Sequence, residues 1–325
     1  MIVQSRKIVT KRGQMLEFIK ANSSNAIGIL ALGEKHFQNW KTNSLPSLEE
    51  YCIRNDIHLL VQTESIATLD DNRKSTWQKL LIPKQIKHFF PHIKNVCYLD
   101  TDIICNPYAE SIFDSQEHGK LHLVSQFKNL PFNLEIAQRR MVFFRKRFYD
   151  KTYPLDSSVF MSPQQIFSYH GFQQFDDYAC AGVFMASIDL CADFLESIYY
   201  KYDDKFVSIT EGDEPVFNFE IQKHFEVKWL PYKFQTLWNF EMSTKYLQLY
   251  DDENISADLI NSAILSTLMN SVFLHFAGSW NEKNSWHKNT FFAKPELLEI
   301  LSEYVKFSRT PVSGKPKGLL RPRIK

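Results

Sequence analysis

The chain has 325 residues, of which 44% are hydrophobic and 14% aromatic, and its formal net charge is +1. A chain of this size and composition can bury a large core, which excludes a wholly disordered or fibrous protein. The small net charge gives no sign of nucleic-acid binding, and we expect none. The five cysteines form no C-x-x-C pair. We therefore expect reduced thiols in the cytoplasm and no zinc site. We also expect no membrane-spanning helix, because no run approaches the roughly 18 apolar residues that such a helix needs.

The first predicted elements form a strand, a helix and a second strand. An apolar run that ends at a glycine, residues 26–33, predicts a central parallel strand. Residues 47–53 have helical spacing, and Ser47 is the expected N-cap of a capping box. Residues 57–62 predict the next strand. A strand, helix and strand in this order form a βαβ unit, which implies a parallel sheet.

After an amphipathic helix predicted at 77–90, two carboxylates interrupt an apolar run. Residues 96–104 read as one buried strand that contains Asp100 and Asp102. Alternate positions of a strand point to the same side, so both carboxylates would repel each other unless a cation lay between them. Hard oxygen ligands suit Mg²⁺ or Mn²⁺. Ligands of open α/β sheets bind beyond the carboxyl ends of strands, so we expect a nucleotide there.

The second half of the chain continues the alternation of strands and helices. Strands are predicted at 121–124, 178–186, 227–230 and 272–276, and helices at 138–149, 190–201, 255–269 and 295–307, with another that opens at Pro215. Arginines and aromatic residues interleave in 138–149, a pattern that suits either nucleic-acid stacking or, as we prefer, a solvated basic helix face. His275 on the last strand would complete a site of two carboxylates and one imidazole, which favours Mn²⁺.

Four motifs in this order resemble a known family of enzymes. They are Tyr-Leu-Asp-Thr-Asp at 98–102, Ala-Gly-Val at 181–183, Asp-Glu-Pro-Val-Phe-Asn at 213–218 and His-Phe-Ala-Gly at 275–278. Over residues 26 to about 286 the chain resembles the retaining GT-A glycosyltransferases of family 8, which include bacterial galactosyl- and glucosyltransferases of lipooligosaccharide and capsule synthesis. Retaining family 32 also has an Asp-x-Asp motif and a segment like 275–280, so it stays open as an alternative.

The resemblance implies an α/β fold of the GT-A, Rossmann-like type, with a mostly parallel central sheet flanked by helices. We expect this domain at 26–290, after a polar lead-in at 1–25 that holds at most one short helix. A C-terminal helix and a basic tail are expected at 291–325. The seven Lys and Arg residues from Lys306 onward would hold the enzyme on the anionic inner face of a membrane, each adding about 1 kcal/mol. A solubilising tail is the alternative.

The resemblance also implies the reaction and its residues. A hexose would pass from a UDP-sugar to a glycan or lipid-linked saccharide acceptor, with retention of anomeric configuration. Asp100, Asp102 and His275 would hold Mn²⁺, or Mg²⁺, on the diphosphate of the donor, and Asp213 and Glu214 would act at the donor sugar. The further implied contacts to the nucleotide sugar are Lys79, Asp100, Ala181, Gly182, Gly278 and Lys283.

Two departures from the family pattern and two rival functions accompany this interpretation. Cys180 stands where the family has asparagine, and Asn281 stands where it has lysine, so Lys283 would replace that lysine only after an insertion.

A nucleotidyltransferase that makes sugar nucleotides would show a glycine-rich phosphate loop near the first strand, where Gly33 stands alone. A non-catalytic glycan-binding module would have no need of two carboxylates and a histidine around a metal.

Overall fold

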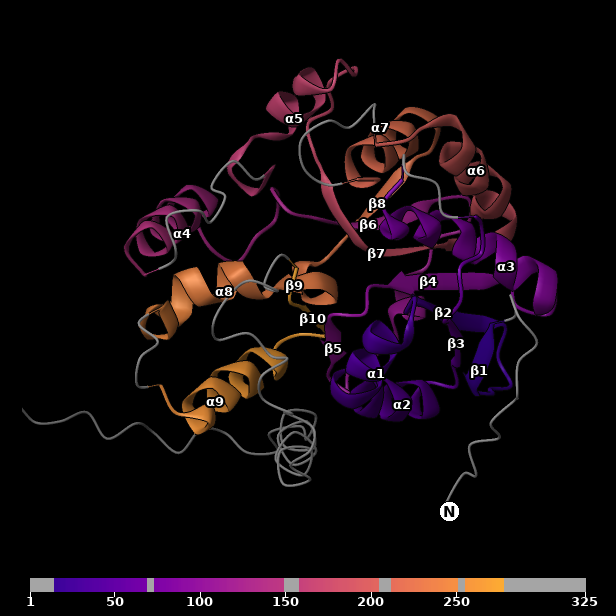
Figure 1. Ribbon diagram of the computed structural model, residues 1–325, viewed down its shortest axis with the longest axis horizontal. Coiled ribbons are helices and arrows are strands. Elements are labelled where there is room, and N and C mark those ends of the chain that lie inside the picture. Colours follow the sequence, from indigo (N-terminus) through magenta and orange to yellow (C-terminus); the bar gives the residue numbers. More distant parts are fainter. Residues whose placement is uncertain (1–14, 69–72, 149–157, 205–211, 251–254, 278–325) are drawn as a thin grey trace, which may run out of the picture.

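The computed structural model describes residues 15–68, 73–148, 158–204, 212–250 and 255–277, the coloured ribbon of Figure 1. Gly278, Lys283, the predicted C-terminal helix and the basic tail lie outside the described residues. Within them, strands and helices alternate along most of the chain. The α/β class and a central sheet flanked by helices are thereby confirmed. Among the described helices, none is both long and apolar enough to cross a membrane.

A seven-stranded sheet forms the centre of the described structure, in the order β1-β3-β2-β4-β7-β6-β8. Its strands are β1 (Leu16–Ile19), β2 (Asn25–Leu30), β3 (His58–Gln62), β4 (Asn95–Leu99), β6 (Leu121–Ser125), β7 (Ala179–Ser187) and β8 (Val227–Leu230). The pairs β2–β3, β2–β4 and β6–β8 are parallel, whereas β1–β3, β4–β7 and β6–β7 are antiparallel. Five of the seven strands, β3, β2, β4, β6 and β8, therefore run in one direction, as expected for a mostly parallel sheet, and β1 and β7 run against them.

A second, three-stranded sheet lies at the end of β4. It consists of β5 (Ile103–Cys105), β10 (Phe273–His275) and β9 (Thr236–Leu237), with β10 in the middle. The prediction of one continuous strand over 96–104 is wrong, since the chain leaves the large sheet after Leu99 and enters the small sheet at Ile103. The main-chain N–H of Asp100 donates to Gly182 O at 2.9 Å, and that of Phe276 donates to Asp102 O at 3.0 Å. These bonds fix both ends of the turn between the sheets.

Helices cover both faces of the large sheet (Figure 1). The described helices are α1 (Glu34–Asn43), α2 (Leu45–Arg54), α3 (Ile82–Phe89), α4 (Leu134–Phe148), α5 (Pro163–Tyr169), α6 (Ile188–Lys201), α7 (Glu214–His224), α8 (Trp238–Lys245) and α9 (Ala257–Leu268). Of these, α1, α2, α3, α6 and α7 share a core with strands of the large sheet. In β4, Val96 and Tyr98 pack in the core shared with α3, α6 and α7, whereas Cys97 and Leu99 pack in the core shared with α1 and α2. Burial on both faces explains the unbroken apolar run of this strand.

Three local predictions are corrected by the structure. The lead-in expected at 1–25 contains β1, which pairs with β3 at the edge of the sheet. Ser47 lies inside α2 and donates to Ser44 O at 3.0 Å, so it forms no N-cap. The helix expected at 77–90 begins as a 3₁₀ helix, η1 (Ser75–Leu81), and becomes α-helical only at Ile82, beside Pro83. Proline is favoured in the first turn of an α-helix, which fits this change.

Candidate functional site

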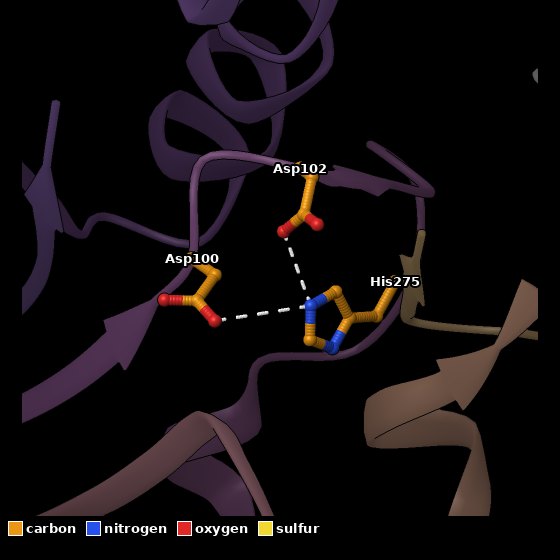
Figure 2. A group of neighbouring side chains, drawn as sticks. All are labelled: Asp100, Asp102 and His275. Atoms are coloured by element: carbon orange, nitrogen blue, oxygen red, sulfur yellow. Dashed lines mark ion pairs between the residues drawn. The ribbon is translucent and has the colours of Figure 1, made fainter. Parts of the chain in front are cut away.

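Asp100, Asp102 and His275 converge where the two sheets meet, as Figure 2 shows. His275 Nε2 lies 3.1 Å from Asp102 Oδ1 and 3.9 Å from Asp100 Oδ2. One ligand atom from each residue lies within 4.8 Å of the other two. Asp102 and His275 are buried, while the side chain of Asp100 is 31% exposed and gives the cluster its open side. The structure thus brings together the three predicted metal ligands, from the inter-sheet turn and from β10.

Gly182 of β7 makes room for this cluster. A Cβ atom at this position would lie 2.3 Å from His275 Cε1 and 2.7 Å from Asp100 Oδ2, closer than any real Cβ contact. On the other side, the Tyr98 hydroxyl donates to Asp100 Oδ1 at 2.7 Å and orients that carboxylate. Tyr98 was not among the predicted site residues, although it lies two residues before Asp100 in the same sequence motif. Its hydroxyl holds Asp100 on the side away from His275.

The charges of the cluster suit a divalent cation. Burial alone would lower the pKa of His275, but the adjacent Asp102 carboxylate outweighs burial and raises this pKa well above its usual range. Two carboxylates therefore surround a position that needs positive charge. Their hard oxygens and one imidazole nitrogen are the donor set preferred by Mn²⁺ and also accepted by Mg²⁺. These residues fit the metal that the family resemblance implies, because their donor atoms already point toward one another.

A buried ion pair lies next to the cluster. Lys79 Nζ of η1 is 2.8 Å from Asp213 Oδ2, directly before α7, and both side chains are almost fully buried. Burial would lower the pKa of Lys79, but the charges of Asp213, Asp100 and Glu214 raise it above its usual range. Lys79 therefore stays protonated and shares one electrostatic network with three carboxylates. The predicted donor contacts Lys79 and Asp213 meet each other, beside the predicted metal ligands.

Glu214, the first residue of α7, is held by the main chain of β7. The N–H of Ala181 donates to Glu214 Oε2 at 3.1 Å, and Gln126 Nε2 lies 3.4 Å from Glu214 Oε1. The Asn218 amide then joins α7 to β7, since it accepts from the Ala179 N–H and donates to the Ala179 carbonyl, both at 2.8 Å. Ala181 thus contributes a backbone donor to the site. Gln126 was missed because it lies outside all four sequence motifs.

A pocket of about 220 Å³ opens beside Asp100 and Asp102. It is lined by Leu30, Leu32, His36, Ser75, Thr76, Tyr98, Asp100, Thr101 and Asp102. Most of these residues lie at or just after the carboxyl ends of β2 and β4, where the sequence predicts a nucleotide, and Ser75 and Thr76 come from η1. The aromatic residues Phe37 and Trp40 of α1 do not line this pocket. Trp40 is fully buried, with its ring 5.4 Å from Phe18, so it is a core residue.

Cys180 lies behind His275, with its Sγ atom 3.7 Å from His275 Nδ1. The residue that departs from the family pattern therefore touches the metal cluster, on the side opposite the carboxylates. All five cysteines are buried free thiols, as expected from their spacing. Burial raises the pKa of the Cys180 thiol, which keeps it protonated and uncharged beside the imidazole.

Comparisons with known proteins found similarity among solved structures, at low sequence identity. No protein-family model matches the chain, and no curated protein matches its sequence. Among solved structures, a glycosyltransferase involved in the glycosylation of the major capsid of the virus PBCV-1 is 12% identical, with a TM-score of 0.46, over 86% of this chain and 99% of that one. The galactosyltransferase LgtC is 12% identical, with a TM-score of 0.41, over 90% and 98%. The glycosyltransferase GlyE of Streptococcus pneumoniae TIGR4 is 13% identical, with a TM-score of 0.43, over 88% and 64%.

Proposed function

We propose that the chain is a metal-dependent retaining glycosyltransferase that transfers a hexose from a UDP-sugar to a glycan or a lipid-linked saccharide. The observation that carries the proposal is the convergence of Asp100, Asp102 and His275 beside a pocket at the carboxyl end of β4. A nucleoside diphosphate needs a hard cation with open coordination positions, and three protein ligands leave such positions. The partly exposed Asp100 carboxylate faces the pocket, where a diphosphate would lie.

The neighbouring charges suit the transfer of a sugar. When the bond between the anomeric carbon and the diphosphate breaks, negative charge develops on the diphosphate and positive charge on the sugar. A divalent cation on Asp100, Asp102 and His275 would supply Lewis-acid stabilisation of the leaving diphosphate. The Lys79 ammonium lies in the same network and would add positive charge on that side. Asp213 and Glu214 would stabilise the positive sugar, and the Ala181 N–H keeps Glu214 in place.

Calorimetric titration of UDP tests the proposal. We expect UDP to bind the wild type with Mn²⁺ and not with chelator, and we expect Asp102→Asn to weaken this binding by about tenfold or more, since it removes a charged metal ligand. Asp114→Asn is the matched control, because Asp114 is an exposed carboxylate in the 3₁₀ helix Ile112–Ser115. This variant should bind UDP as the wild type does. UDP-sugars scored for UDP release would then identify the donor hexose.

Two results would contradict the proposal. Equal UDP binding by the wild type and Asp102→Asn would remove the cluster from the donor site. No UDP binding in any condition would exclude a UDP-sugar donor.

We also propose a cytoplasmic protein that contacts the inner face of a membrane through its basic tail, as its composition suggests. The full chain should therefore co-sediment with anionic vesicles, and a chain that ends at Phe307 should not. Equal co-sedimentation of both chains would contradict this contact.

A further inference from the structure

Gln235 lies behind His275, on the side away from the carboxylates. It is the last residue of the 3₁₀ helix η4 (Tyr232–Gln235), directly before β9, and its side chain is buried. Gln235 Nε2 lies 3.0 Å from His275 Nδ1, whereas His275 Nε2 faces Asp102 at 3.1 Å. The two ring nitrogens thus have separate surroundings. One faces the candidate metal position, and the other faces an amide and, 3.7 Å away, the Cys180 thiol.

A metal ligand needs its other ring nitrogen to be satisfied. His275 can bind a cation through Nε2 only when that nitrogen carries no proton, and the neutral ring then carries its proton on Nδ1. A buried N–H group without an acceptor costs about 1–3 kcal/mol. The amide of Gln235 lies at hydrogen-bond distance and contains a strong acceptor, whereas the thiol of Cys180 accepts only weakly.

The present orientation of the amide fits one of the two proton positions of a neutral ring. Its nitrogen faces Nδ1, which suits a ring that accepts at Nδ1 and donates from Nε2 to Asp102. Gln235 Oε1 is buried, and no hydrogen bond to it is found among the described residues. A half-turn of the terminal amide exchanges its nitrogen and oxygen and presents Oε1 to Nδ1. The side chain can therefore serve either proton position of the imidazole.

We propose that Gln235 is a positioning residue for the metal ligand His275. Its carbonyl oxygen accepts a hydrogen bond from the Nδ1–H group and so leaves the Nε2 lone pair free to bind a divalent cation. This inference rests on the proposed function, since it assigns a partner to one of the proposed ligands. It also gives a reason for a buried glutamine between η4 and β9, a place where an apolar side chain would otherwise be expected.

Binding of Mn²⁺ to the full chain tests this role, with free Mn²⁺ measured by electron paramagnetic resonance. We expect Gln235→Leu to weaken Mn²⁺ binding by about tenfold or more, because partners of metal-ligating histidines typically contribute 10–100-fold to affinity. Gln235→Glu keeps an acceptor and should bind within about threefold of the wild type or more tightly. Gln222→Leu is the control, since Gln222 is a glutamine of α7 whose Nε2 donates to Asp177 O at 2.9 Å, and it should bind as the wild type does.

A second measurement locates the proton. In the Mg²⁺-loaded wild type, long-range ¹H–¹⁵N spectra of the histidine rings should show His275 protonated at Nδ1 and not at Nε2. Equal Mn²⁺ affinity of Gln235→Leu and the wild type would overturn the role of Gln235 and leave the proposed function standing. Equal weakening in Gln235→Leu and Gln235→Glu would overturn it too, since packing would then explain both. A wild type that binds no Mn²⁺ would overturn both the inference and the proposed metal dependence.

Discussion

Gly182 is the single residue on which the shape of the metal cluster depends most directly. A methyl group there would overlap His275 Cε1 and Asp100 Oδ2. We expect Gly182→Ala to lower the free energy of unfolding by about 1–3 kcal/mol, because the core is overpacked. We also expect it to weaken Mn²⁺ binding by about tenfold or more, because the ligands must move apart. Chemical denaturation and Mn²⁺ titration measure the two effects.

Gly28→Ala is the matched control for Gly182→Ala. Gly28 lies on the central strand β2, where a Cβ atom would be 2.7 Å from Ile82 Cγ2, away from the metal ligands. It should lose stability to a similar degree, about 1–3 kcal/mol, and bind Mn²⁺ as the wild type does. If both variants bound Mn²⁺ equally well, the close approach at Gly182 would have no role in the cluster.

The ion pair between Lys79 and Asp213 sets a second expectation for single residues. Lys79→Met leaves a buried carboxylate without its cation, and Asp213→Asn leaves a buried ammonium, so each should cost about 3–5 kcal/mol of unfolding free energy. The double variant should cost clearly less than the sum of both, because neither charge is then left unpaired. Urea denaturation of all four proteins gives this coupling.

An exposed ion pair provides the comparison for Lys79 and Asp213. Lys84 and Asp193 lie 2.6 Å apart, but their side chains are 36% and 62% exposed. Removing this pair should cost less than about 1 kcal/mol, because water screens it. Additive losses for the buried pair would show that its charges do not depend on each other and would contradict the network inferred for the site.

At the scale of elements, the sequence predicts which segments are buried but not how they pair. The apolar runs predict β2, β3, β4, β6, β7 and β8 close to their observed places. The direction of β7 was not predictable, since an apolar run looks the same in either direction. The break after Leu99 was missed because Ile103 and Ile104 continue the apolar pattern in another sheet. β9, with two residues, is too short to show any period.

His122 of β6 makes the stability of the central sheet depend on pH. Its Nε2 accepts from the Glu117 N–H at 2.8 Å, and its Nδ1 lies 3.2 Å from Met185 O of β7, so the ring is neutral and donates from Nδ1. Burial lowers the pKa of His122 below its usual value. Unfolding therefore favours protonation of the ring. The stability due to the neutral ring is present above the unfolded pKa, about 6.5, and is lost as the pH falls through the folded pKa.

His122→Gln tests this dependence. The variant should be less stable than the wild type at about pH 7.5, since it loses hydrogen bonds, and the gap should narrow at about pH 5.5, where the wild type loses the contribution of neutral His122. Urea denaturation of both proteins at the two pH values measures the gap. A gap that stays constant, or widens on acidification, would contradict the proposed protonation change in β6.

At the scale of the whole molecule, the site lies where the two sheets join. Asp100 follows β4 of the large sheet, Asp102 precedes β5 of the small sheet, and His275 lies on β10. The sequence identified these three residues through a motif and its order in a family. It gave no sign of Gln235 or Gln126, because a lone glutamine fits many roles and its role depends on neighbours distant in sequence.

A cation that joins the two sheets should stabilise the whole fold. A ligand that binds only the native state adds about 2.7 kcal/mol of stability when it is present at 100 times its Kd. Mn²⁺ at that level should therefore raise the melting temperature of the wild type by roughly 3–8 °C, and chelator should reverse the shift. The melting temperature of Asp102→Asn should show roughly no Mn²⁺-dependent rise. That of Asp114→Asn, which changes an exposed residue, should rise as the wild type's does. The expected difference arises because Asp102 connects the turn after β4 to His275, and a cation bound elsewhere on the surface would stabilise all three proteins alike.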